Sequence, residues 1–243
     1  DIRAVIEKAF VEANRATAPF LRRSPTTGLP PAFTALEDIR FQGSFAPSPK
    51  TPAGPPSPSR AEIEGIAEGA GLPFEDVFEL NVNCEVGPAL HSAACSVYGF
   101  ADEEGRAWLG KSDDLEEAEL GCNAVHHTAP SGALRSVQMH FVGTIWTTSA
   151  VNEAGFCLGM TGLSGRFGNE GGIPTLFLLH ALAERCRSVA EAETMCAEFE
   201  LGRNGMSVLM GDVTGDLAIL EKHVSGQAIR RPTGTGVAER WPT

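Results

Sequence analysis

The sequence predicts an α+β fold, in which helices and strands occupy separate stretches of the chain. Three observations support this prediction: helical periodicity in the first part, short strands with turn signals from Cys95 onward, and a second helical stretch from Pro174 that is followed by strands again. This order favours a layered α+β domain over a doubly wound parallel sheet, in which helices and strands would alternate.

The N-terminal part is expected to be mainly helical, with one irregular stretch. Apolar residues recur at helical spacing in the first turns: Ile2, Val5, Ile6, Ala9 and Phe10. Residues 43–59 are rich in proline, which lacks an amide donor and restricts φ, so a loop is expected there. Ser59 and Glu62 form a capping-box pattern for a helix that stops near Gly69 and Gly71. A second short helix is expected around residues 74–80.

The strand predictions start at Cys95. Residues 96–100 and 106–110 are expected to pair as a hairpin, and the further strands are: 135–142, 145–151, 155–160, 206–212 and 217–221. Between them, Pro174 is suited to the first turn of a helix that extends to about Arg187. Ser188 and Glu191 form a second capping box, which begins the next helix.

Composition limits the function classes. The 243 residues include 19 Lys and Arg against 31 Asp and Glu, a net charge of −12 that disfavours nucleic acid and anionic membranes. We find no apolar stretch long enough for a transmembrane helix and no secretory signal, so a cytoplasmic protein is expected. The six cysteines show no C-x-x-C pair, and we therefore predict neither a zinc site nor a disulfide framework.

Three blocks of the sequence resemble the penicillin acyltransferase family. The run from Ala61 to Val77, followed by Leu80-Asn81, is similar to the family's propeptide pattern E-x-x-G-I-A-E-G-A-G…F-E-D-V…L-N. Ala94-Cys95-Ser96 resembles the family's autocleavage junction, where Cys-Thr is usual. The third block is similar to the N-E-x-G turn and the G-x-P…S-V-x-E-A helices of the family: residues 151–156, 172–174 and 188–192.

The resemblance implies an N-terminal-nucleophile (Ntn) hydrolase, whose fold is a four-layer αββα sandwich of two antiparallel sheets flanked by helices. Such proteins are made as precursors that cut themselves, and the freed N-terminal residue is the catalyst. The implied cut lies between Ala94 and Cys95. Residues 1–94 would then be a propeptide or α-chain segment, and residues 95–243 the β chain of one composite domain, with the two fragments associated. Homo-oligomerisation is left open.

Cys95 is the predicted nucleophile. A thiol reacts as its thiolate, and a pKa of about 8.5 leaves an ordinary cysteine mostly protonated at neutral pH. After the cut, the α-amino group of the same residue lies within reach and can take the proton. A histidine partner is therefore not required, and the other five cysteines are interpreted as core residues.

The resemblance suggests three further site residues. Asn152 matches the family's oxyanion-hole asparagine, although an asparagine in a hairpin turn is the structural alternative. Related Ntn cysteine hydrolases show G-[RQ]-N-x-D where this chain has Gly110-Lys111-Ser112-Asp113-Asp114. Lys111 then takes the Arg or Gln position, and Asp114 takes the aspartate that would orient the Cys95 ammonium. A solvated acidic run is the alternative for Asp114.

The resulting hypothesis is a self-activated cysteine hydrolase or acyltransferase that cleaves an amide through a Cys95 thioester and passes the acyl group to water or an amine. A small-molecule acyl-amide or acyl-thioester is the expected substrate, with no cofactor and no metal. A catalytically degenerate Ntn-fold binding protein is the alternative, favoured by the altered 110–114 segment and by the lack of the family's T-N-H or T-N-x-P segment up to Thr243. The histidines, His180 among them, are expected to be structural or solvated. A papain-like protease is a weaker third hypothesis.

Overall fold

The computed structural model describes six stretches of the chain: residues 58–86, 95–114, 122–163, 173–201, 205–223 and 226–232. The helix predicted at residues 2–10, nearly all of the proline-rich stretch and Ala94 lie outside them. Within these stretches, two helices precede six strands, two more helices follow, and three strands close the order. The predicted sequence of helices, strands, helices and strands is therefore confirmed for the described part.

The first two helices form a pair. Helix α3 (Pro58–Ala70) ends at Gly71, whose φ of 66° belongs to the left-handed region that glycine adopts without strain. The Leu72 amide donates to the Ala67 carbonyl at 3.0 Å and closes the last turn. Helix α4 (Phe74–Val86) follows directly and runs one and a half turns beyond the predicted helix. Both helices contribute buried side chains to the main core.

The larger sheet is fully antiparallel and has the strand order β3-β4-β5-β6-β7-β8-β9. Its strands are β3 (Asn123–Thr128), β4 (Ser136–Phe141), β5 (Ser149–Asn152), β6 (Cys157–Leu163), β7 (Gly205–Gly211), β8 (Leu217–His223) and β9 (Gly226–Arg230). The smaller sheet is the predicted hairpin of β1 (Cys95–Ala101) and β2 (Ala107–Asp113). The two sheets give the molecule its layered form.

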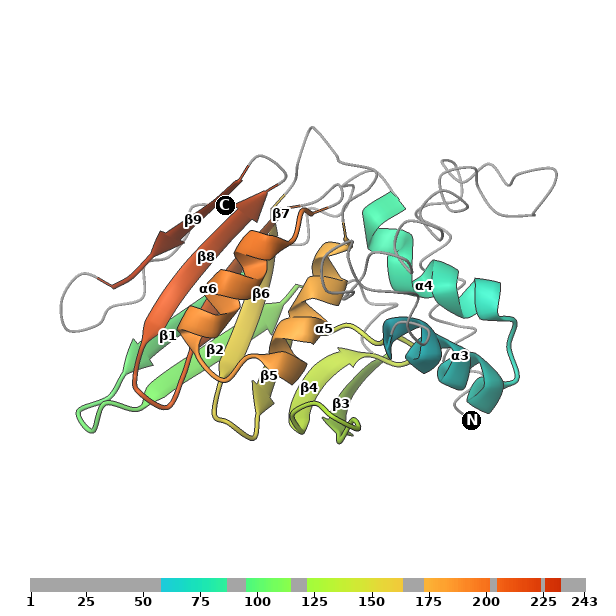
Figure 1. Ribbon diagram of the computed structural model, residues 1–243, viewed down its shortest axis with the longest axis horizontal. Helices are drawn as coiled ribbons and strands as arrows, with labels where there is room; N and C mark the ends of the chain where they lie inside the picture. Colours follow the sequence, from blue (N-terminus) through green and yellow to red (C-terminus); the bar gives the residue numbers. More distant parts are fainter. Residues whose placement is uncertain are drawn as a thin grey trace.

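The larger sheet lies between the hairpin and a pair of helices. Helices α5 (Thr175–Arg185) and α6 (Val189–Glu198) cover one face, and β1 and β2 lie across β6 and β7 on the other (Figure 1). The hairpin comes close to β7, because a Cβ built on Gly99 would lie 2.9 Å from the Leu209 side chain. This arrangement confirms the two stacked antiparallel sheets of the predicted sandwich, and in the described stretches α5 and α6 provide a helical layer on one side of them.

Strand alternation divides the larger sheet into two faces with different surroundings. The helix-side face carries most of the apolar core, with Leu158, Met160, Val208 and Met210 packed under α5 and α6. The inter-sheet face carries the alternate residues of the same strands and packs against the hairpin. Gly159, for example, lies beneath the Val97 side chain.

The hairpin has an exposed outer face. Tyr98, Phe100 and Trp108 are each more than two-fifths exposed, and the Phe100 and Trp108 rings stack with centroids 6.5 Å apart. The Trp108 indole donates to Asp102 at 2.8 Å. The side chains on the other face of the hairpin, which meet the larger sheet, are half-buried.

Two strand predictions needed correction. The strand predicted at 145–151 begins only at Ser149, because the Ile145 amide donates to the Asn81 side chain of α4 at 2.8 Å, and Ile145 is buried in the core. The edge strands β3 and β9 were not predicted. The polar residues His126 and His127 lie in β3, which can accept them because an edge strand pairs on one side only.

Candidate active site

The candidate site begins at the end of the hairpin. Cys95 is the first residue of β1 and lies directly opposite Asp113, the last residue of β2. Its thiol points to the Asp113 carboxylate, with 3.7 Å between Sγ and Oδ1, and the residue is half-buried. Cys95 shares the face of Val97 and Gly99, which is the face of the hairpin that meets the larger sheet.

Lys111 occupies the preceding inward position on β2. Its ammonium donates to Asp113 Oδ1 at 2.5 Å and to the Ser112 carbonyl at 3.1 Å, and its side chain is only 7% exposed. The aliphatic stem packs over Gly159 of β6. A lysine this deeply buried requires a paired anion, and Asp113 provides one.

The larger sheet contributes a third contact to Asp113. Thr148, just before β5, donates its hydroxyl to Asp113 Oδ2 at 3.3 Å. The Asp113 carboxylate therefore accepts from the Cys95 thiol and the Lys111 ammonium at Oδ1 and from the Thr148 hydroxyl at Oδ2. These contacts join the two sheets at one point. We refer to Cys95, Lys111, Asp113 and Thr148 as the Asp113 cluster.

Asp114, the aspartate indicated by the family spacing, is not part of this cluster. It follows the last residue of β2 and is exposed. Asp113 takes its place beside Cys95, and the sequence analysis had missed this residue. Strand parity could have identified it, because Lys111 and Asp113 share one face of a strand and Asp114 would continue onto the other.

Asn152 lies on the opposite face of the larger sheet from Cys95. Its amide nitrogen donates to the carbonyls of Ala183 at 2.9 Å and Cys186 at 2.7 Å, at the C-terminal end of α5. Its oxygen accepts the amides of Ala154 and Phe156 in the β5–β6 turn. Both amide hydrogens thus donate to backbone carbonyls in this structure, which supports the structural alternative for Asn152.

Three of the other cysteines have unreactive surroundings. Burial raises the pKa of Cys157 to about 11, and burial raises the pKa of Cys186 and of Cys196 to about 12. Their thiols therefore remain protonated at neutral pH. No disulfide links Cys95, Cys122, Cys157, Cys186 and Cys196 to one another.

Two further observations leave the candidate site at Cys95 unchanged. A shallow hollow of about 430 Å³ is bounded by Arg185, Glu191 and Met195 on the helical layer, which lies across the larger sheet from Cys95. None of the helices in the described stretches combines the length and the hydrophobicity needed to cross a membrane.

Solved structures offer distant likenesses. A penicillin V acylase from Agrobacterium tumefaciens is 18% identical with a TM-score of 0.44, covering 57% of this chain and 49% of its own. A variant of conjugated bile acid hydrolase from Clostridium perfringens is 13% identical with a TM-score of 0.44, covering 56% and 51%. An N-acylethanolamine-hydrolyzing acid amidase ortholog from Caenorhabditis elegans is 10% identical with a TM-score of 0.48, covering 58% and 64%.

The chain thus spans about half to two thirds of the length of these structures. A comparison with curated protein sequences finds no significant match.

A protein-family model also matches the chain. The model described as acyl-coenzyme A:6-aminopenicillanic acid acyl-transferase matches residues 101–238, which is more than half of the chain. The matched region includes Lys111, Asp113 and Thr148 of the Asp113 cluster and begins six residues after Cys95. The chain therefore belongs to the acyl-coenzyme A:6-aminopenicillanic acid acyltransferase family.

Proposed function

We propose that this protein is a cysteine amidohydrolase or acyltransferase of the Ntn type, with Cys95 as its nucleophile. One observation carries the proposal: the Cys95 thiol faces the Asp113 carboxylate across paired strand ends, next to the ammonium of Lys111. Family membership supports acyl transfer as the reaction, since the family is named for an acyl-coenzyme A thioester and an amine acceptor.

Self-cleavage before Cys95 prepares the nucleophile. The cut between Ala94 and Cys95 leaves residues 1–94 and 95–243 as two fragments and frees the α-amino group of Cys95. That amino group accepts the thiol proton, so one residue supplies both the nucleophile and the base. The register supports this role, because the Cys95 backbone lies directly opposite Asp113, whose carboxylate can hold the resulting ammonium in place.

The reaction has two stages. In the first, the Cys95 thiolate attacks the acyl carbonyl, the bond to the leaving nitrogen breaks, and the α-ammonium returns a proton to that nitrogen. The product of this stage is a thioester on Cys95 and a free amine. In the second, the α-amino group removes a proton from water or an acceptor amine, which attacks the thioester and regenerates the thiol. An acyl thioester substrate enters by the same first stage with a thiol as the leaving group.

Lys111 and Asp113 have complementary electrostatic roles in this scheme. The Lys111 ammonium places positive charge beside a sulfur that reacts as an anion, and positive charge favours a thiolate. Asp113 keeps the Lys111 ammonium in that position and orients the end of β1 that carries Cys95. Thr148 fixes the second carboxylate oxygen, so the carboxylate cannot rotate freely.

The segment before the cut is expected to remain attached to the rest of the molecule. Ile63, Val77 and Phe78, from α3 and α4, are almost fully buried in the same core cluster as α5 and β7. Dissociation of this segment would expose those side chains, at about 25 cal/mol for each Å² of apolar surface. We therefore expect one associated particle of two chains after cleavage.

Mass spectrometry tests the proposal directly. Purified protein should contain a fragment that begins at Cys95, and an electrophilic acyl probe should add its acyl mass to that fragment alone. The Cys95→Ala variant should remain one uncut chain and acquire no acyl group. A cut at the same place in Cys95→Ala, or acylation of another residue, contradicts the proposal.

Departures at residues 111 and 112 favour a second candidate function. Lysine and serine stand where related enzymes have arginine or glutamine and then asparagine, and lysine lacks the bidentate geometry of arginine. These changes are consistent with a protein that binds an acyl ligand without turning it over. A single uncut species that binds an acyl-amide but never becomes acylated supports this candidate.

A further inference from the structure

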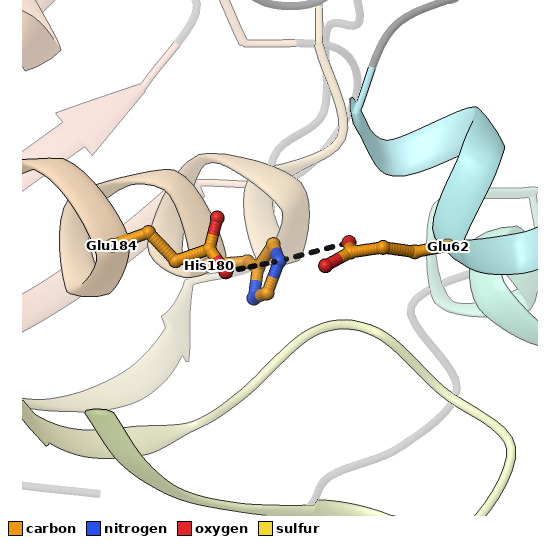
Figure 2. Close-up of side chains that lie close together, drawn as sticks. All are labelled: Glu62, His180 and Glu184. Carbon is orange, nitrogen blue, oxygen red and sulfur yellow. Dashed lines mark hydrogen bonds and ion pairs between the residues drawn. The ribbon is translucent and has the colours of Figure 1, made fainter. Parts of the chain in front are cut away.

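Three ionisable side chains converge beneath the helices, on the opposite side of the larger sheet from the Asp113 cluster. Glu62 reaches in from α3, while His180 and Glu184 lie one turn apart on α5 (Figure 2). His180 Nε2 lies 3.1 Å from Glu62 Oε2 and 3.5 Å from Glu184 Oε1. One ligand atom from each of the three lies within 4.8 Å of the other two.

Glu184 is buried without full hydrogen bonding of its carboxylate. The residue is only 6% exposed, and its Oε1 atom, which faces His180, has no hydrogen-bond partner. The 3.5 Å separation from His180 is an ion-pair distance and supplies no hydrogen bond. A buried carboxylate oxygen without a partner is costly, so this atom indicates that a group is still to be bound there.

The charge of the cluster indicates a cation. Two ionised carboxylates and one neutral imidazole carry two negative charges, and protonation of His180 would still leave one in excess. A divalent cation would neutralise the two carboxylates while leaving the imidazole neutral.

The orientation of His180 suits metal binding. The Gln138 amide nitrogen donates to Ser136 at 2.8 Å, which turns its Oε1 oxygen toward His180 Nδ1 at 3.3 Å. This assigns the Nδ1 proton to the bond with Gln138, so Nε2, which faces the two glutamates, is the nitrogen at which a metal ion would replace a proton. Metal-bound histidines are commonly oriented by a similar bond from the other ring nitrogen.

We propose that Glu62, His180 and Glu184 form a binding site for a divalent transition-metal cation, with Zn²⁺ as the best fit. One imidazole and two carboxylates suit Zn²⁺, which binds nitrogen and oxygen at about 2.0–2.2 Å. Tetrahedral ligands at that distance lie about 3.3–3.6 Å apart, and the separations of 3.1 and 3.5 Å from His180 Nε2 are near this range.

The site has an access path and an open coordination position. The Glu62 side chain is 35% exposed, so a cation can enter from the solvent side of α3. Three protein ligands leave the fourth tetrahedral position for water. Because Glu62 belongs to α3 and the other two ligands to α5, bound metal would connect the segment before Cys95 to the segment after it.

Metal binding can be tested separately from catalysis in the Cys95→Ala variant, which removes the half-buried thiol as a competing ligand. After chelator treatment, we expect Zn²⁺ to bind with one-to-one stoichiometry by calorimetry. At roughly 100 times the dissociation constant, the unfolding temperature should rise by about 5–10 °C. Co²⁺ should give the visible absorption of a tetrahedral nitrogen and oxygen site.

Matched variants assign the ligands. Glu184→Gln and Glu62→Gln preserve side-chain size but remove a charged ligand, and each should reduce Zn²⁺ affinity by about 10-fold or more. Glu68→Gln, at an exposed position of α3, should bind as the parent does. Failure of Zn²⁺ to raise the unfolding temperature of the parent, or an equal rise in both ligand variants, overturns the metal site. Either result leaves the thiol chemistry of Cys95 untouched.

Discussion

Polar side chains on the two sides of the larger sheet are satisfied in different ways. On the hairpin, which packs against the inter-sheet face, the half-buried thiol of Cys95 has one close polar contact within the described stretches, the carboxylate of Asp113. On the helix-side face, Asn152 makes four hydrogen bonds to backbone groups and is 5% exposed. A reactive group needs donors or acceptors that remain available to a substrate, whereas a structural group has its donors and acceptors engaged within the protein.

This comparison explains why one residue of the family motif gained support as a catalyst and another lost it. Cys95 and Asn152 both lie at strand ends, and both match the family pattern. They lie on opposite sides of the larger sheet. Cys95 belongs to the hairpin that packs against the inter-sheet face, and Asn152 lies on the helix-side face. We therefore expect substitutions in the Asp113 cluster to change turnover, and substitutions on the helix-side face to change stability.

Replacement of the nucleophile should have the largest effect. Cys95→Ala removes the sulfur and should abolish both self-cleavage and turnover, because the thioester cannot form. Intact mass and acyl release measure the two losses. Cys157→Ala is the matched control, since burial raises the pKa of that thiol to about 11, and its turnover should stay within about twofold of the parent.

The paired aspartates test which carboxylate serves Cys95. Asp113→Asn keeps the shape of the side chain but removes the charge that pairs with Lys111, and turnover should fall by about 100-fold or more. Asp114→Asn, at the exposed neighbouring position, should leave the rate nearly unchanged. Steady-state rates at equal folded concentration decide between them, and the reverse ranking would restore the assignment based on motif spacing.

Asn152 should affect stability. Asn152→Ala removes the groups that bond the end of α5 to the β5–β6 turn and leaves buried carbonyls and amides without partners. We expect a loss of about 2–4 kcal/mol in the free energy of unfolding, measured by denaturant titration. Asn123→Ala, at an exposed position of β3, should cost less than about 0.5 kcal/mol. A large drop in rate without a drop in stability would return Asn152 to the catalytic site.

The histidines of the helix-side face should give a smaller, pH-dependent effect. Burial and the neighbouring His126 lower the pKa of His140 to about 4, well below the usual value for histidine. The unfolded chain then binds a proton at a higher pH than the folded one, so stability falls as the pH drops from about 6.5 to about 4.

His140→Gln should therefore remove about 2–3 kcal/mol of the stability difference between about pH 7 and pH 4. His126, whose pKa burial also lowers, acts in the same direction. His180 acts oppositely: although burial opposes its charged form, contacts with Glu62 and Glu184 raise its pKa, so its contribution fades as the pH rises. Unfolding titrations of His140→Gln and of a His180→Gln variant across this range check the two signs.

Local signals in the sequence predicted much of the fold. The capping box at Ser188 is present, with its side chain accepting the Glu191 amide at 3.2 Å, and the predicted hairpin of β1 and β2 forms in register. Contacts between distant parts of the chain set the rest. Asn81 pulls Ile145 out of the predicted strand, and no local pattern reports a hydrogen bond across 64 positions.

The candidate sites show the same division. The position of Cys95 and the inward orientation of Lys111 follow from motif and strand parity. Parity also selects Asp113, but the family spacing pointed to its neighbour. The meeting of Glu62 with His180 across 118 positions required the packing of α3 on α5, and the sequence therefore indicated only an ordinary helical histidine.

The aromatic outer face of the hairpin offers a built-in optical reporter. Trp108 is 51% exposed and lies on the strand pair that carries Cys95, whereas Trp146 is 4% exposed within the core. Their indoles should therefore fluoresce at different wavelengths, the exposed one further to the red. Subtracting the emission spectrum of a Trp108→Phe variant from that of the parent would isolate the signal of the hairpin. Motion of the hairpin during acylation could then be distinguished from loosening of the interior without an attached dye.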